Sequence, residues 1–428
     1  MTPDPCTGSA VSPAEAARAA RRPLVYAVLG VWLFVPILTW FYWPAADGLD
    51  VQGYAIGRDF INTWVGPQLA FGGRLTTLFD FPAYNHAIGE LFGHPLRYFH
   101  AWVYPLHALP LLWPLGKLPY AAALALWTLG LFAVFATVVL REVAPDKRLT
   151  AGLALACAPA CLINMIGGQT GFLTGALLLG GVLAIDRRPI LAGVLFGFLT
   201  LKPHLGLVLP FALVALGAWR VVASATLTFA ALIALSVALF GIDPWVNYLH
   251  VTGAREVFVF ERFQGFLTDM VCSVFAAGRT FHVPYQIALD IQLAVSLPVI
   301  IAACWAVRRT ADPCRRAFVL AAAAPLVSPY VFNYDLPALA AVQVWMLAGR
   351  LPWRREWAVL SLVVWATPLA LMYSGLLGIA IAPPILLLMF CASVREAVGG
   401  TAAGHVALAD DAGRSAQAAP ARPRLLGA

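Results

Sequence analysis

A few polar residues interrupt the long apolar stretches of this sequence. Arg58 and Asp59 follow the first apolar stretch, Gln169 separates two short ones, and Lys202 and His204 separate two more. A carboxylate in such a place can act as a general base toward a hydroxyl group. A lysine, a histidine or an amide can hold an anionic group such as a lipid-linked phosphate. The residue types therefore suggest group transfer with an anionic substrate.

Two further segments carry aromatic and acidic side chains next to apolar stretches. Tyr104 belongs to an aromatic-rich segment, and Tyr330 and Asp335 lie in a short link between two apolar stretches. Each feature also has a structural explanation. Asp59 could cap a helix, Lys202 could reach toward the membrane surface, and Asp335 could face a helix dipole. The aromatic residues could form a belt at the membrane interface. The residue types alone leave both explanations open.

The composition shows what surrounds these residues. Of the 428 residues, 61% are hydrophobic and 11% are charged, whereas a soluble domain carries about 25% charged residues. Lipid must therefore be the solvent for most of the chain. The net charge of +7 comes from Lys and Arg clusters between apolar stretches, a pattern typical of cytoplasmic loops in membrane proteins. We therefore expect membrane lipids as partners and no binding of nucleic acid.

The apolar stretches predict the fold class. The first, at 24–43, has the roughly 20 residues that a helix needs to cross ~30 Å of hydrocarbon. Backbone groups inside a membrane must hydrogen-bond within the protein, so the crossing segments should be helical. We predict an all-α polytopic bundle of about 11–13 transmembrane helices over residues 24–395. Residues 1–23 and 396–428 are predicted to form a disordered cytoplasmic leader and tail.

The basic clusters predict which side of the membrane each loop faces. They are the clusters at 141–148, 187–188, 308–316 and 350–355. The positive-inside rule places all of them in the cytoplasm. The long hydrophilic loops 44–100 and 242–286 then fall on the outer face, together with the polar residues named above. This arrangement requires that segment 101–116, which three prolines interrupt, does not cross the membrane.

Short motifs recur along the chain in a definite order. They are D-F at Asp59, L-F-D ending at Asp80, Y-P at Tyr104, P-L-x-x-L-P over 114–119, G-Q ending at Gln169, A-G-x-L-x-G-x-x-x-L-K-P over 192–203 and S-P-x-x-x-x-Y-D over 328–335. In this order they resemble glycosyltransferase family 87 over residues 24–395. That family is the polyprenyl-phosphate-mannose-dependent α-1,2-mannosyltransferase-like family, with the GT-C fold. One departure is Tyr104-Pro105-Leu106, where the family pattern is Y-P-P.

The resemblance implies an enzyme that transfers a sugar from a polyprenyl-phosphate carrier to a glycolipid or glycan acceptor. It implies that this happens on the outer face of the bacterial cytoplasmic membrane. The catalytic aspartate of the family falls on Asp59, and Gln169, Lys202 and Asp335 are expected to line the site. The predicted substrate-binding residues are Arg58, Tyr104, Gln169, Lys202, His204, Tyr330 and Asp335.

Chemistry on a lipid-phosphate donor agrees with these residue types. Polyprenyl phosphate is a stable anionic leaving group, so no general acid has to protonate it. An inverting transfer then needs one carboxylate to deprotonate the acceptor hydroxyl and cations or amides to hold the phosphate. Arg255 or Arg262 of the second outer loop could add to the cations. No nucleotide-binding glycine loop and no D-x-D-like acidic pair is evident, so we expect neither a cofactor nor a metal.

Two other classes of protein remain as alternatives. A transporter or flippase would be expected to place paired charges near the middle of the bilayer and to show an internal repeat. The sequence shows no clear repeat, and its polar residues are predicted to gather on one face, which favours the enzyme. A purely structural membrane protein would leave Lys202 and Asp335 without an explanation.

Overall fold

The computed structural model of the chain describes residues 13–98, 100–251 and 270–417. Within these ranges the chain is all-α, as predicted, and only isolated bridges join extended segments. The helices up to residue 240 are α1 (Pro13–Ile37), α2 (Phe60–Phe71), α3 (Phe81–Phe92), α4 (Ala108–Gly116), α5 (Tyr120–Ala125), α6 (Leu131–Leu140), α7 (Arg148–Ala156), α8 (Pro159–Gly167), α9 (Gly171–Ala184), α10 (Pro189–Leu199), α11 (Leu209–Ala215) and α12 (Trp219–Phe240). The later helices are α15 (Val274–Thr280), α16 (Tyr285–Arg308), α17 (Pro313–Val327), α18 (Pro337–Leu347), α19 (Ala358–Leu376) and α20 (Ala382–Gln417).

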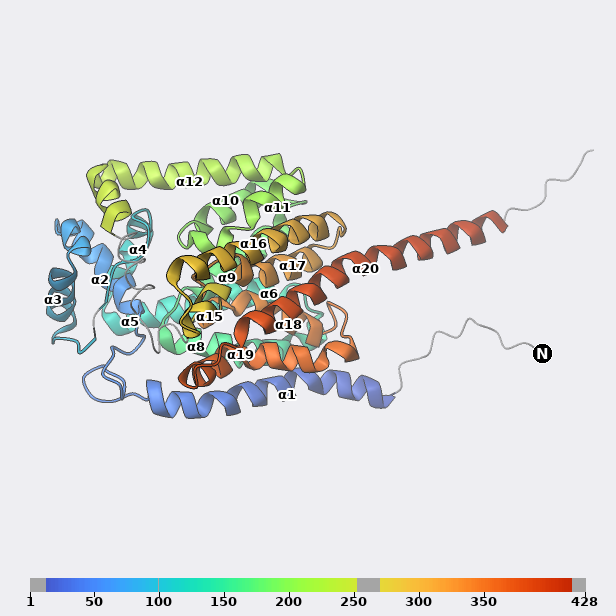
Figure 1. Cartoon of the computed structure of the whole chain (residues 1–428), viewed down its shortest axis with the longest axis horizontal. Helices are drawn as coiled ribbons and strands as arrows, with labels where there is room; N and C mark the ends of the chain where they lie inside the picture. The colour runs from blue at the N-terminus through green and yellow to red at the C-terminus, as the bar shows by residue number, and fades with distance from the viewer. Residues whose placement is uncertain (1–12, 99, 252–269, 418–428) are drawn as a thin grey trace, which may run out of the picture.

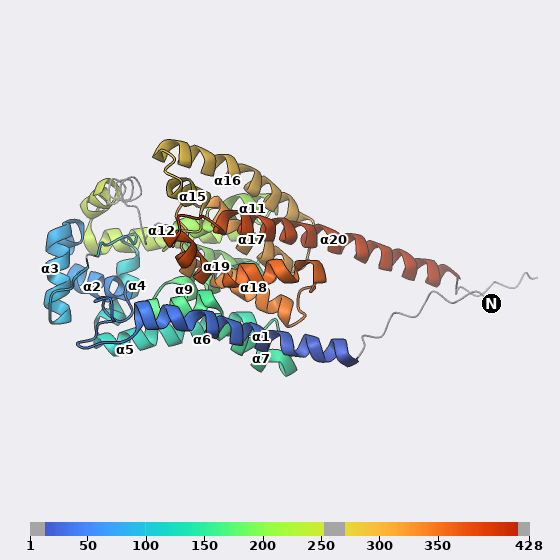
Figure 2. The same ribbon diagram turned by 60° about the horizontal axis from the view of Figure 1, so that its bottom comes forward.

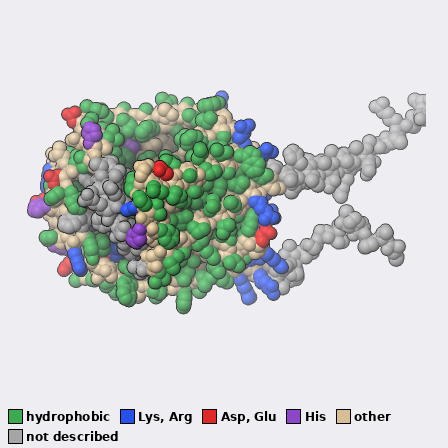
Figure 3. Space-filling model, in the orientation of Figure 1, with side chains coloured by type: hydrophobic (Ala, Val, Ile, Leu, Met, Phe, Trp, Pro, Cys, Tyr) green, Lys and Arg blue, Asp and Glu red, His purple; other side chains and the backbone are tan. Residues whose placement is uncertain are grey.

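Most of the longer helices run along one common direction (Figure 1). Six stretches in the described part of the chain are long and apolar enough to cross a membrane, and the bent pair α7–α8 makes a seventh. These stretches are Ala17–Tyr42, Tyr120–Leu140, Trp219–Phe240, Tyr285–Arg308, Arg355–Gly375 and Ala382–Gly399. Large apolar side chains face outward along them, as Trp32 does on α1 and Leu227 on α12, and apolar atoms cover much of the side of the bundle (Figure 3). The protein is therefore a multi-pass membrane bundle.

The interior of the bundle contains shorter helices. α9 has 14 residues, and α10 and α18 have 11 each. At 1.5 Å per residue they are roughly 21 and 17 Å long, well short of ~30 Å of hydrocarbon. α18 is buried along its whole length. These helices are therefore short interior elements, and Gln169, Lys202 and Asp335 lie in the links next to their ends.

A small group of helices, α2, α3 and α4, covers one end of the bundle, called here the α2–α4 end (Figures 1 and 2). Two of them, α2 and α3, lie within the predicted outer loop 44–100, which thus contains two helices of 12 residues each. α4 packs on α2 and has 9 residues, a length of about 14 Å that cannot cross a bilayer. That segment 101–116 stays on one side of the membrane remains a prediction.

Lys and Arg side chains gather at the other end, called here the basic end, where both termini leave the bundle (Figure 3). Ion pairs join neighbouring helices there: Arg316 of α17 lies 2.7 Å from Asp186, which follows α9. Arg350, after α18, lies 3.0 Å from Asp312, which caps α17. The two ends of the bundle therefore differ sharply in charge.

The two termini differ from the prediction. α1 begins at Pro13 rather than near Leu24, and α20 continues to Gln417, where an irregular tail was expected from residue 396. Both extensions are rich in alanine, the residue with the highest intrinsic helix propensity. Composition alone suggested disorder because it ignored that propensity.

Candidate active site

Asp59 lies directly before α2, at the α2–α4 end of the bundle. Its backbone is helical, with φ −69° and ψ −13°, and its side chain makes no capping bond to the helix. One carboxylate oxygen instead accepts a 2.7 Å hydrogen bond from Nε2 of Gln169, a buried residue 110 positions later in the chain. The Asp59 side chain therefore does not cap α2, and helix capping does not explain why an aspartate occupies this position.

Arg58 is held by the protein on several sides. Its backbone has φ +39°, which non-glycine residues rarely adopt. The guanidinium pairs with buried Asp50 at 2.8 Å and donates to the backbone oxygen of Phe41. It also lies between the rings of Tyr42 and Tyr54. These contacts make Arg58 a positioning residue for the Asp59 loop, and its contact with substrate stays a prediction.

A break between two helices places Gln169. α7 and α8 are bent by 60° where Pro159 begins α8. Near the end of α8, buried Asn164 donates from Nδ2 to the backbone oxygen of Tyr334, and its Oδ1 accepts from the backbone N–H of Gly171 at 2.9 Å. Irregular backbone at membrane depth is stable only when its polar groups are bonded in this way. Asn164 was not among the predicted site residues, although a polar amide within an apolar helix is a usable signal.

Gly168 allows the Gln169 link to approach the Asp59 loop. It has φ +56°, and a Cβ atom there would lie 2.6 Å from Cβ of Phe60 and 2.7 Å from the backbone oxygen of Gly57. Only glycine fits both the left-handed backbone and this close approach. The contact fixes the spacing between Gln169 and Asp59.

We expect Gly168→Ala to reduce both stability and sugar transfer. A left-handed alanine costs about 1–2 kcal/mol, and the contact with the Asp59 loop must also open. Gly217→Ala is the matched control, because Gly217 has φ +65° with open space around the position of a Cβ atom. Thermal unfolding in detergent should show a loss for both variants, whereas transfer activity should fall only for Gly168→Ala. Equal activity in the two variants would contradict a role for this spacing.

Lys202 and Asp335 form a second polar cluster. The Lys202 ammonium lies 2.5 Å from Oδ1 of Asp335, and their side chains are 13% and 0% exposed. The other oxygen of Asp335 accepts from the backbone N–H of Phe332 at 3.1 Å. The ammonium also lies 4.8 Å from the centre of the Tyr334 ring. Asp335 therefore holds the lysine in place, and the ammonium remains the group within this pair that could bind an anion.

Two tyrosines lie within reach of both carboxylates. Burial raises the pKa of Tyr104, and the negative charges of Asp59 and Asp335 raise it further. Burial likewise raises the pKa of Tyr334 well above its usual value, with added contributions from the same two carboxylates. Both phenols therefore stay protonated at neutral pH and can donate hydrogen bonds. Asn164 joins the Gln169 link to Tyr334, the residue before Asp335, so the Asp59–Gln169 and Lys202–Asp335 pairs belong to one site.

The two remaining predicted residues, His204 and Tyr330, lie in different surroundings. His204 follows Lys202 in a 3₁₀ turn, Pro203–Gly206, and its Nε2 is buried without a hydrogen-bond partner among the described residues. The Tyr330 hydroxyl lies 3.2 Å from that of Tyr285, and its ring packs against Phe275. The structure thus places His204 next to the lysine and directs Tyr330 toward α15 and α16.

Two expectations are not tested by the described residues. Arg255 and Arg262 lie outside them. In the described part of the chain, no group of three His, Cys, Asp or Glu side chains is placed to hold a metal ion, and metal-free chemistry stays a prediction.

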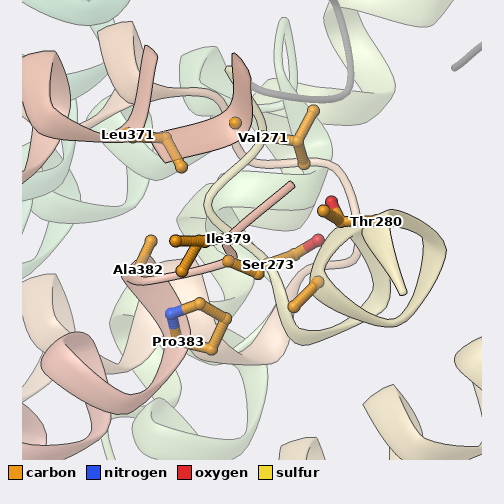
Figure 4. A pocket seen from close by; sticks show the side chains of 10 residues that line it. Val271, Ser273, Thr280, Leu371, Ile379, Ala382 and Pro383 are labelled. Carbon is orange, nitrogen blue, oxygen red and sulfur yellow. The ribbon is translucent and has the colours of Figure 1, made fainter. Parts of the chain in front are cut away.

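A shallow hollow opens beside α15 and the start of α20 (Figure 4). Its lining is apolar apart from the hydroxyls of Ser273 and Thr280. Val271, one of the lining residues, forms an isolated antiparallel β-bridge with Phe332, three residues before Asp335. The lining carries no titratable side chain, so the hollow cannot supply acid–base chemistry, and the polar site lies elsewhere.

The apolar bundle and its cluster of buried polar side chains define a multi-pass membrane protein with a candidate active site. The chain matches the model of glycosyltransferase family 87 over residues 102–329, just over half of its length. It therefore belongs to that family and is a membrane glycosyltransferase. No curated protein and no solved structure matches it. Tyr104, Gln169, Lys202 and His204 lie within the matched range, whereas Asp59 and Asp335 lie outside it.

Proposed function

We propose that the protein transfers a sugar, mannose or another hexose or pentose, from a polyprenyl-phosphate carrier to a hydroxyl of a glycolipid or glycan. Asp59 takes the proton of the acceptor hydroxyl, and that oxygen bonds to C1 of the sugar. The bond from C1 to the phosphate oxygen breaks, and the polyprenyl phosphate leaves with its electron pair. The attack from the opposite face inverts the configuration at C1.

The observation that carries this proposal is that Asp59, unlike the other carboxylates of the site, forms no ion pair with a described residue. The two other carboxylates of the site, Asp50 and Asp335, are paired with Arg58 and Lys202. Among the described residues Asp59 has no cationic partner, and a neutral amide orients it. Asp59 is therefore the carboxylate best suited to accept a proton.

The lysine cluster supports a phosphate donor. A polyprenyl-phosphate sugar is a phosphodiester with a single negative charge, and its lipid tail keeps the phosphate at the membrane surface. Lys202 is mostly buried near the end of the short helix α10, where an ammonium can stabilise the charge that develops on the leaving phosphate. His204 and the protonated Tyr334 could add hydrogen bonds to the phosphate.

The position of the basic side chains at one end of the bundle supports a site on the outer face of the membrane. Basic loops stay on the cytoplasmic side of a membrane, and the basic end of the bundle lies opposite α2–α4 (Figure 3). The site then opens on the outer face of the cytoplasmic membrane of a bacterium. Membership of a glycosyltransferase family favours this enzyme over a transporter or flippase.

The donor class can be tested with the purified protein in liposomes. Polyprenyl-phosphate mannose, glucose and arabinose are compared with GDP-mannose and UDP-glucose, and the acceptor is an envelope extract of a source strain that lacks the gene. We expect label to move from at least one polyprenyl-phosphate sugar and from neither nucleotide sugar, because a nucleotide sugar has no lipid tail to hold its phosphate at the membrane surface. Transfer from a nucleotide sugar alone would contradict the proposal. The labelled product identifies the acceptor.

A further inference from the structure

His100 is a buried histidine beside the Asp59 site that the mechanism above does not use. It is 6% exposed, and its Nε2 has no hydrogen-bond partner among the described residues. Most buried polar atoms in native proteins are bonded, and leaving one unbonded costs stability. An unpartnered nitrogen is therefore an unusual feature that a bound ligand would explain.

The backbone of His100 is fixed from both sides. Its N–H donates to Oδ1 of Asn85 at 2.7 Å, and its carbonyl oxygen accepts from Nδ2 of the same residue at 2.9 Å. Asn85 belongs to α3 and also bonds to the backbone oxygen of Phe81. The extended segment that carries His100 is thus held on the α2–α4 group, which limits the positions that the imidazole can take.

His100 lies near the start of α2, which Asp59 precedes. Its partner Asn85 adjoins Tyr84 in α3, and the Tyr84 hydroxyl donates at 2.8 Å to Oδ1 of Asn62, three residues after Asp59. Burial lowers the pKa of His100, and the negative charge of Asp59 partly opposes that change. The ring is therefore neutral at pH 7, with one nitrogen as a donor and the other as an acceptor. A neutral ring suits an uncharged hydroxyl better than a phosphate.

The position of His100 separates it from the phosphate side. Lys202 lies in the link from α10 to α11 and Asp335 in the link from α17 to α18, whereas His100 is held by the α2–α4 group that covers the end of the bundle. A lipid-anchored phosphate approaches from the membrane, and the acceptor hydroxyl must approach Asp59 from the other side. We infer that His100 binds the sugar acceptor, with Nε2 bonded to a second hydroxyl beside the one that Asp59 deprotonates. This inference rests on the proposed function.

The test compares His100→Phe with His107→Phe in the transfer assay, with the active polyprenyl-phosphate sugar and serial dilutions of the envelope extract. His107 is the matched control, since it is also buried with one unpartnered nitrogen, but it stacks on Trp245 and contacts Thr200. We expect the apparent acceptor KM to rise about tenfold in His100→Phe. The donor KM should not change, and His107→Phe should keep the wild-type acceptor KM. His100→Gln, which keeps an amide near the place of Nε2, should recover part of the loss.

A purely structural histidine predicts another result. His100→Phe would then keep the wild-type acceptor KM and gain thermal stability, because an unbonded polar atom is removed. That result, or a rise in the donor KM alone, would overturn the inference. If the phenylalanine variant does not fold, His100→Gln and His100→Met provide the same comparison with side chains of equal length. Wild-type protein that is inactive with every polyprenyl-phosphate sugar would contradict the proposed function itself, together with this inference.

Discussion

Replacing Asp59 by asparagine is expected to reduce the rate of sugar transfer by about 100-fold to 10,000-fold, the usual contribution of a general base. The amide cannot accept the proton of the acceptor hydroxyl. Its oxygen can still accept the hydrogen bond that Nε2 of Gln169 gives to Asp59, so the link between α8 and α9 should stay in place. The loss should therefore appear in kcat, with the donor KM nearly unchanged. Initial rates at saturating donor and acceptor measure it.

Asp80→Asn is the matched control for this substitution. Asp80 also belongs to the α2–α4 group, but its carboxylate caps α3 by accepting from the backbone N–H of Ala83 at 2.9 Å. Asparagine caps helices about as well as aspartate, so this variant should keep wild-type activity and stability. Full activity in Asp59→Asn, or an equal loss in both variants, would remove Asp59 as the base.

Much of the fold follows from elementary properties of the sequence. The low charge content requires lipid as solvent, and the basic clusters assign the loops to two sides. From these two facts the sequence predicts that Asp59, Gln169, Lys202 and Asp335 share one face of the bundle. The structure brings them together at one end, as the pairs Asp59–Gln169 and Lys202–Asp335.

The pairing itself could not be predicted from the sequence. Interior helices such as α18 are apolar on every face, so hydrophobic periodicity does not show which helices are neighbours. The contacts that hold Arg58 depend on a tight loop that brings Asp50 next to its guanidinium. No sequence motif predicts that loop. The shortness of the interior helices α9, α10 and α18 could not be predicted either, because apolar stretches in a sequence do not show helix ends to within a turn.

Replacing Lys202 by methionine is expected to reduce both stability and donor binding. The carboxylate of Asp335 is fully buried, and removing one partner of a buried ion pair costs about 3–5 kcal/mol. The substitution also removes the cation that we propose holds the donor phosphate. Losing a charged hydrogen bond of about 1.5–3 kcal/mol corresponds to a donor KM roughly 10-fold to 100-fold higher. Thermal unfolding in detergent and the donor KM measure the two effects.

The double variant Lys202→Met/Asp335→Asn separates these two effects. Asparagine removes the unpaired buried charge and keeps an oxygen that can accept from the backbone N–H of Phe332, as Asp335 does. Stability should therefore return toward the wild-type value, whereas the donor KM should stay high. Asp335→Asn alone leaves the ammonium beside the Tyr334 ring and free of its carboxylate, so its donor KM should equal or fall below that of the wild type. If the double variant instead recovers the wild-type donor KM, Lys202 does not bind the phosphate. The loss in Lys202→Met then came from the unpaired Asp335 charge.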